Sequence, residues 1–143
     1  MLFDAQNKYS DAQAVTADAA STNIIDHGAV RNLGVGENLY VVVSVDVAMT
    51  DASSNSTCTV TLETDDNASF SSATTAQTIG TFAALAAIGT RLVARLQPDK
   101  VNERYTRLKY TMANGDLSTG SFTAFLTKEI DAYTAYADAI TIS

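Results

Sequence analysis

Alternating apolar and polar positions dominate the middle of the chain. Four segments alternate in this way: 39–49, 57–64, 104–112 and 121–128. A repeat of two residues matches the side-chain period of a β-strand, and the threonines of 57–64 suit a solvated face. We therefore predict four strands, each with one face in a core. In the first of them, every odd-numbered residue from Leu39 to Met49, Val47 included, is predicted to share the core face.

Polar turn signals separate these segments. Residues 51–56 form a polar loop, and the Asn114-Gly115 pair favours a hairpin between the last two strands. Weaker strand patterns cover residues 13–16, 22–25, 76–79 and 90–96. About eight short strands with polar turns predict an all-β protein, a single-domain antiparallel jelly roll (β-sandwich) that spans residues 1–143.

Three segments fit the strand pattern less well. The alanine-rich run 82–88, which ends before Gly89, has the composition of a single helical turn. We interpret residues 1–20 as an N-terminal arm or an edge strand. We interpret residues 130–143 as a mostly extended C-terminal tail. The predicted sandwich therefore carries extended N- and C-terminal arms.

Composition and charge argue against several classes of function. The net charge of −7 and the pI of about 4.4 argue against a general binder of nucleic acid or of an anionic membrane, because phosphate groups attract the opposite sign. One cysteine and one histidine leave little of the chemistry that depends on thiolate or imidazole. No segment has the length and composition of a signal peptide or a membrane span. We expect no enzyme activity and no cofactor.

Individual residues with reactive side chains have simpler interpretations. His27 follows Asp26, but without a nucleophile motif nearby we interpret it as a loop histidine. Asp65-Asp66-Asn67 offers oxygen ligands for Ca²⁺, yet it lacks the spacing of a calcium loop, and a turn is the preferred interpretation. Cys58 falls on the apolar face of its segment and is predicted to be an inert core thiol.

Charge is unevenly distributed along the chain. Residues 91–109 hold six basic and two acidic residues, whereas residues 1–88 hold two basic and ten acidic residues. Such asymmetry suits self-association or docking on a charged protein surface. It equally suits basic residues placed on strand edges to discourage aggregation. Both interpretations stay open.

A series of short motifs carries a resemblance. These are LFD (2–4), SDAQA (10–14), STNIIDHG (21–28), LETDD (62–66), AIG (87–89) and NERYTRLKY (102–110), followed by Gly120 and Thr123-Ala124. In this order and spacing, residues 2–128 resemble the jelly-roll capsid cement (decoration) proteins of tailed bacteriophages. The chain departs from that pattern at His27, where an apolar residue is expected, and beyond Lys128.

The resemblance implies a function and its partners. A cement protein is a structural component of the virion that binds the outer surface of a phage head and bridges neighbouring major capsid protein subunits. The implied partners are the major capsid protein and the chain itself, as a homodimer in preference to a homotrimer, with no nucleic acid and no membrane. The implied location is the outer capsid surface, after synthesis in the cytoplasm of the bacterial host.

Two groups of residues are predicted to make the contacts. The arms have little core pattern but carry apolar and aromatic side chains, and the segment 104–109 is basic. The predicted contact residues are Leu2, Phe3, Tyr9, Arg104, Arg107, Lys109, Tyr133 and Tyr136. The alternative function is a carbohydrate-binding or host-attachment module. Such a module would use exposed aromatic side chains on one flat face, and its candidates are Tyr40, Tyr105, Tyr133 and Tyr136.

Overall fold

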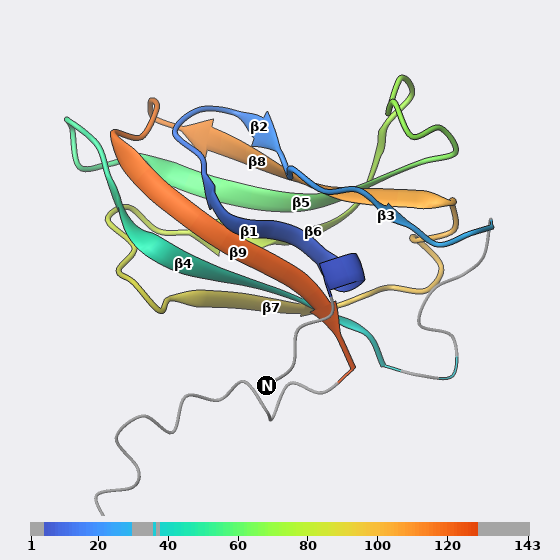
Figure 1. Ribbon diagram of the computed structural model, residues 1–143. Coiled ribbons are helices and arrows are strands. Elements are labelled where there is room, and N and C mark those ends of the chain that lie inside the picture. Colours follow the sequence, from blue (N-terminus) through green and yellow to red (C-terminus); the bar gives the residue numbers. More distant parts are fainter. Residues whose placement is uncertain (1–4, 30–35, 37, 129–143) are drawn as a thin grey trace, which may run out of the picture.

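The computed structural model describes residues 5–29, 36 and 38–128, and within them two antiparallel sheets face each other (Figure 1). The first sheet, here the β4 sheet, has the order β1-β9-β4-β7. Its strands are β1 (Lys8–Ala14), β9 (Thr119–Thr127), β4 (Tyr40–Thr50) and β7 (Arg91–Arg95). A short 3-10 turn, η1 (Ala5–Asn7), precedes β1.

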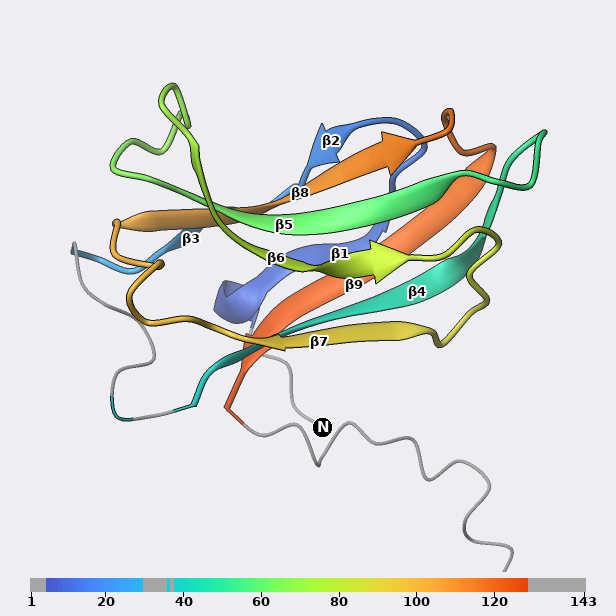
Figure 2. The same cartoon turned by 180° about the vertical axis from the view of Figure 1, so that it is seen from behind.

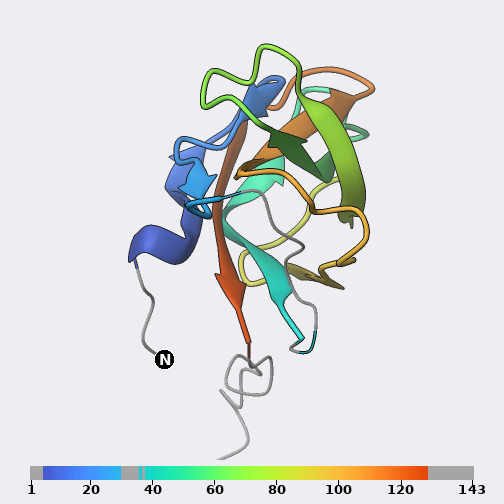
Figure 3. The same cartoon turned by 90° about the vertical axis from the view of Figure 1, so that its right-hand side faces the viewer.

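The second sheet, here the β5 sheet, has the order β2-β8-β5-β6, and β3 also pairs with β8. Its strands are β2 (Ala19–Ala20), β3 (Ile25–Asp26), β8 (Tyr105–Ala113), β5 (Thr57–Asp65) and β6 (Thr74–Phe82). In the view from behind, β5 and β6 form part of the upper layer, and β9 and β4 form part of the layer below it (Figure 2). Turned by 90°, the view places η1 and β1 on one side of the molecule and β6 on the other (Figure 3).

The order of the strands is that of a jelly roll. The short strands β2 and β3 both pair with β8, so they occupy one position and the sandwich has eight. Apart from the steps from β2 to β3 and from β5 to β6, every connection crosses from one sheet to the other. This alternation distinguishes a jelly roll from a stack of simple hairpins. The predicted fold class is confirmed.

The core fills the space between the sheets, where the alternation of the sequence placed it. Cys58, Val60 and Leu62 of β5 are fully buried, while the threonines between them face outward. Phe122 of β9 stacks against Phe82 of β6 and Tyr110 of β8, with both ring centroids 5.3 Å from its own. Aromatic side chains from both sheets therefore meet in one cluster.

Val47 corrects the predicted core of β4. Its side chain is 47% exposed, whereas Val45 and Met49 are buried as expected. The pairing of β4 with β9 shifts register between Val45 and Val47 and again before Thr50. A bulge adds one residue to one strand and so reverses which face the next side chain takes. Two such shifts turn Val47 outward and then return Met49 to the core.

Two local predictions between strands are also wrong. The turn at Asn114-Gly115 forms, and both residues have positive φ, but β8 and β9 belong to different sheets. The pair therefore reverses the chain between layers and does not close a hairpin. The run 82–88 contains turns and no helix, and Leu85 takes a positive φ of 59°.

The N-terminal region is part of the sandwich from Lys8 onward. β1 pairs with β9 at one edge of the β4 sheet, and Tyr9 and Val15 are buried in the core. Of the two interpretations of residues 1–20, the edge strand is therefore the correct one for this part. The predicted tail, residues 130–143, lies outside the described residues.

The aromatic contact between the sheets leads to a prediction about stability. Phe122→Ala should lower the free energy of unfolding by about 3–5 kcal/mol, because it removes a buried ring and leaves a cavity. Val47→Ala in the same sheet should change it by less than about 1 kcal/mol, because Val47 is half exposed. Urea unfolding of both variants measures the difference. Equal losses would contradict the position given to Val47.

Candidate functional site

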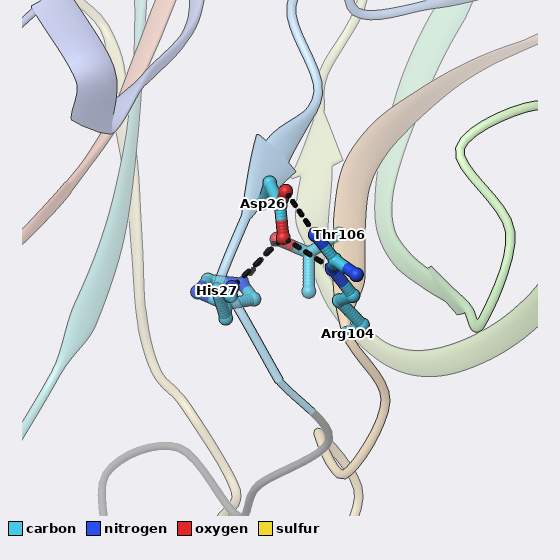
Figure 4. A network of polar contacts seen from close by, with 5 residues as sticks. Asp26, His27, Arg104 and Thr106 are labelled. Atoms are coloured by element: carbon cyan, nitrogen blue, oxygen red, sulfur yellow. Dashed lines mark hydrogen bonds and ion pairs between the residues drawn. The ribbon is translucent and has the colours of Figure 1, made fainter.

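The predicted basic strand β8 begins beside a carboxylate. Nε of Arg104 donates to Oδ1 of Asp26 at 2.8 Å, and its Nη2 donates to Oδ2 at 3.0 Å. Asp26 is held in place because β3 pairs with β8 and the backbone N–H of Gly28 donates to Oδ1. Figure 4 shows the carboxylate of Asp26 facing the guanidinium of Arg104. The hydrogen bonds from Arg104, followed by that from Gly28, lower the pKa of Asp26 to about 2.

Thr106 connects this corner to the core. Its hydroxyl lies 2.9 Å from Nε2 of His27 and 2.8 Å from the hydroxyl of Tyr9 (Figure 4 shows the His27 contact). The backbone N–H of His27 donates to the carbonyl of Arg104 at 2.9 Å. His27 thus joins β3 to β8 through both its backbone and its ring, a role that is structural.

Tyr9 belongs to the core and not to the surface. Its side chain is fully buried, and burial raises the pKa of its hydroxyl above the ordinary value. Its prediction as a contact residue is therefore corrected: the sequence of the N-terminal region gave little core pattern, but β1 packs Tyr9 between the sheets. Any partner contact of the N-terminal region has to come from other residues.

Arg107, which lies in β8, is paired with a carboxylate in the same way. Nε of Arg107 donates to Glu63 of β5 at 2.7 Å, and the two residues are direct partners in the register of the sheet. The guanidinium also lies 4.3 Å from the ring centroid of Phe70, in the loop between β5 and β6. Such a cation–π contact holds the arginine against the loop.

The same loop accounts for the candidate calcium ligands. Asp65 is buried, and its carboxylate accepts hydrogen bonds from the backbone N–H groups of Asn67 and Ser72. These bonds lower the pKa of Asp65 against the opposing effect of burial, which is the largest single influence. The carboxylate therefore serves as the internal support of a turn, as the preferred interpretation of the sequence had it.

The charge of β8 is largely compensated within the fold. Arg104 and Arg107 each face a carboxylate, and within the described residues no ion pair is found for Lys109. Arg104 directly precedes β8, while Arg107 and Lys109 lie in it, and together the three residues present less net positive charge than the sequence suggests. Four other predicted residues, Leu2, Phe3, Tyr133 and Tyr136, lie outside the described part of the chain.

The arrangement of tyrosines does not favour a flat sugar-binding face. Tyr40 lies on the outer side of the β4 sheet, since Val41 and Val43 beside it point into the core. Tyr105 lies on the outer side of the β5 sheet, opposite in direction to the buried Thr106. The guanidinium of Arg104 also lies over its ring, 5.1 Å from the centroid. The two tyrosines therefore cannot form one platform.

An exposed apolar surface lies elsewhere, around the loop between β6 and β7. Five large apolar side chains are exposed in the described residues, and four of them lie on this loop or on the strands beside it: Val47, Leu85, Ile88 and Val93. Sequence reasoning missed this surface because it assigned the loop to a helical turn. The available signal was an apolar run from 82 to 88 that has no polar face of its own.

β7 is the edge strand next to this surface. Arg91, Val93 and Arg95 alternate on its outer side, and Val93 is 40% exposed. The side chain of Gln77 in β6 accepts from the backbone N–H of Gln97 and donates to the carbonyl of Arg95. Gln77 thus bonds to the chain at the end of β7, and two arginines lie on the outer side of this edge strand. Basic residues on a strand edge were one of the two interpretations of the charge asymmetry.

The described residues contain few groups suited to chemistry. They include no cluster of three histidine, cysteine or acidic side chains that could hold a metal ion. No helix in this part of the chain is long and apolar enough to span a membrane. Burial raises the pKa of Cys58 to about 12, which keeps the thiol protonated at neutral pH, as predicted for a core residue.

The pair between Asp26 and Arg104 gives a pH-dependent prediction. Because the folded pKa of Asp26 lies below its ordinary value of 3.8, the pair stabilises the fold above that pH. Asp26→Asn should therefore be less stable than the wild type at pH 7, and the difference should disappear as the pH falls from about 4 to about 2. Urea unfolding across this range measures it, with the exposed Asp116→Asn as the control. A difference that does not change with pH would contradict the assignment.

Comparison with known proteins gives one family. The model of the Bbp16 family matches residues 9–126, a stretch that begins in β1 and ends in β9. A chain in the structure of infectious bursal disease virus, Gx strain, is similar with a TM-score of 0.48 and 11% identity, over 89% of this chain and 32% of that one. This chain therefore spans about a third of that chain's length. No curated protein matches the sequence.

Proposed function

The chain belongs to the Bbp16 family, and from this premise we propose that it is a structural cement, or decoration, protein of a phage head. It would bind the outer surface of the head and bridge neighbouring subunits of the major capsid protein. The family, whose name is associated with bacteriophages, supports this proposal. The family match over residues 9–126 and the resemblance to cement proteins over residues 2–128 cover the same jelly roll.

The fold suits a bridging role. A cement protein has to hold two neighbouring subunits at a fixed separation, which requires a body that does not deform between its contact surfaces. In this sandwich, most connections cross between the sheets and the aromatic cluster joins them. Contacts of about 1,600 Å² each, repeated over the shell and linked by such a body, stabilise through avidity. No catalytic residue is needed.

The proposed contact residues are those predicted from the sequence, except one that the fold buries. Leu2, Phe3, Tyr133 and Tyr136 remain proposed contacts from the chain ends, and Tyr9 is left out because it is buried. Arg104, Arg107 and Lys109 form a second proposed contact, through Lys109 in the first place since both arginines are already paired. The proposed partners are the major capsid protein and the chain itself, with a homodimer favoured over a homotrimer.

The proposal predicts binding to shells that lack the protein. The purified chain should sediment with shells assembled from the major capsid protein of the encoding virus, at a fixed number of copies per subunit. Removing residues 1–4 or residues 129–143 should lower this occupancy, because both ends carry proposed contacts. Deletion up to Gln13 is unsuitable as a test, since it would remove most of β1 and the buried Tyr9. Gradient sedimentation and mass spectrometry measure the occupancy.

Two controls make this experiment decisive. Circular dichroism of each truncated chain checks that the sandwich is intact, and native mass spectrometry gives the number of copies in the free oligomer. Full-length protein that stays at the top of the gradient in the presence of shells would contradict the proposed function. Full occupancy by both truncated chains would leave the function standing and remove the chain ends from the contact surface.

A further inference from the structure

The exposed apolar surface at the β6–β7 loop is held in place by the fold. We call it the β6–β7 patch and define it by Val47, Leu85 and Ile88, which are 47%, 51% and 70% exposed, together with Val93 of β7, which is 40% exposed and pairs with Val42, five residues along β4 from Val47. Monomeric proteins seldom leave several large apolar side chains exposed together unless the surface binds something. The β6–β7 patch is therefore a candidate interface that the sequence did not indicate.

Hydrogen bonds anchor the loop on both sides of Val47. The backbone N–H of Met49 donates to the carbonyl of Ala86 at 3.0 Å. Val45 exchanges two bonds of 2.9 Å with the other end of the loop, donating to Thr90 and accepting from Gly89. Ala86 itself is buried in the core. Because residues 86–90 are tied to Val45 and Met49, the backbone of the loop that carries Leu85 and Ile88 is fixed alongside the part of β4 that contains Val47.

The backbone of the loop also keeps an apolar side chain outward. Leu85 has a φ of 59°, in the left-handed region that a bulky residue seldom adopts. The side chain of Leu85 is half exposed, so packing in the core does not account for a leucine at this position. Glycine or asparagine would occupy this position with less strain. A leucine here is consistent with a side chain that serves a contact outside the chain.

The charges next to the β6–β7 patch are positive. Arg91 and Arg95 flank Val93 on the outer side of β7, and no ion pair is found for either within the described residues. Residues 83–98 contain no aspartate or glutamate. The carboxylate of Asp46, on the neighbouring strand, accepts a hydrogen bond from Thr123. The patch therefore joins exposed apolar groups to arginines that have no carboxylate partner in the described fold.

These charges argue against a second copy of the chain as the occupant. A two-fold contact through this surface would bring Arg91 and Arg95 of one copy towards the same residues of the other. Like charges facing each other across an interface are unfavourable. A surface that is apolar and bears carboxylates would instead complement both features.

We propose that the β6–β7 patch, with Arg91 and Arg95, is the surface that docks on the shell, and that it meets an apolar surface of the capsid protein that carries carboxylates. This inference rests on the proposed function and goes beyond it, because it names a contact away from the chain ends and β8. It also separates two interfaces: self-association would use another part of the molecule.

A pair of isoleucine variants tests the apolar part. Ile88→Asp should weaken binding to shells about tenfold or more, because it puts a charge into a contact that excludes water. Ile24→Asp is the matched control, since Ile24 is also exposed, at 41%, but directly precedes β3 of the other sheet. Occupancy against protein concentration gives the apparent Kd. Thermal unfolding checks that both variants are folded.

A charge reversal tests the basic part. Arg95→Glu should weaken binding to shells severalfold and make it less sensitive to salt, because it removes an attraction to carboxylates. Lys100→Glu, an equal change at an exposed residue of the next loop, should leave binding unchanged. Native mass spectrometry of Ile88→Asp should give the same oligomer as the wild type.

The outcomes separate this inference from the function on which it rests. If the wild type and Ile88→Asp bind shells equally well, the proposed function stands and the β6–β7 patch is not the docking surface. A change in oligomeric state caused by Ile88→Asp would make the patch a contact between copies, which overturns the inference. If the wild type fails to bind shells, the proposed function falls, and the inference with it.

Discussion

The ring of Phe122 lies between those of Phe82 and Tyr110, and this contact is what holds the two sheets at one spacing and one register. Phe122 belongs to β9 of the β4 sheet, while its neighbours belong to β6 and β8 of the β5 sheet. The chain also crosses between the sheets at most of its connections, which joins the two layers covalently. A sandwich whose layers are joined in this way suits the proposed bridging role.

The parts of the fold that could be predicted are those governed by the alternation of side chains. Alternation along β5 and β8 matches their burial, because these two strands pair with each other without a register shift. It was wrong at Val47, where bulges depend on the partner strand. The turn at Asn114-Gly115 was recognised, but a local signal does not tell which sheet the following strand joins. Long-range packing decided both cases.

The candidate site was harder to predict because its charges are paired across the fold. Arg104 meets a carboxylate 78 residues away and Arg107 meets one 44 residues away. Counting charges along the chain therefore overstated the positive surface of β8. It understated the importance of β7, whose arginines lie beside the exposed Val93. The run 82–88 was misread as a helical turn because its backbone bonds to β4 through the carbonyl of Ala86, with Ala86 buried and Leu85 and Ile88 exposed.

Buried apolar groups thus form the core of the sandwich, and exposed ones form the surface that is proposed to dock on the shell. Electron cryomicroscopy of shells decorated with the full chain tests this account most directly, because it places the jelly roll on the shell without any substitution. The account predicts that the β6–β7 loop and β7 face the capsid protein, with carboxylates of the shell near Arg91 and Arg95. A jelly roll whose β6–β7 loop points away from the shell into solvent would contradict it.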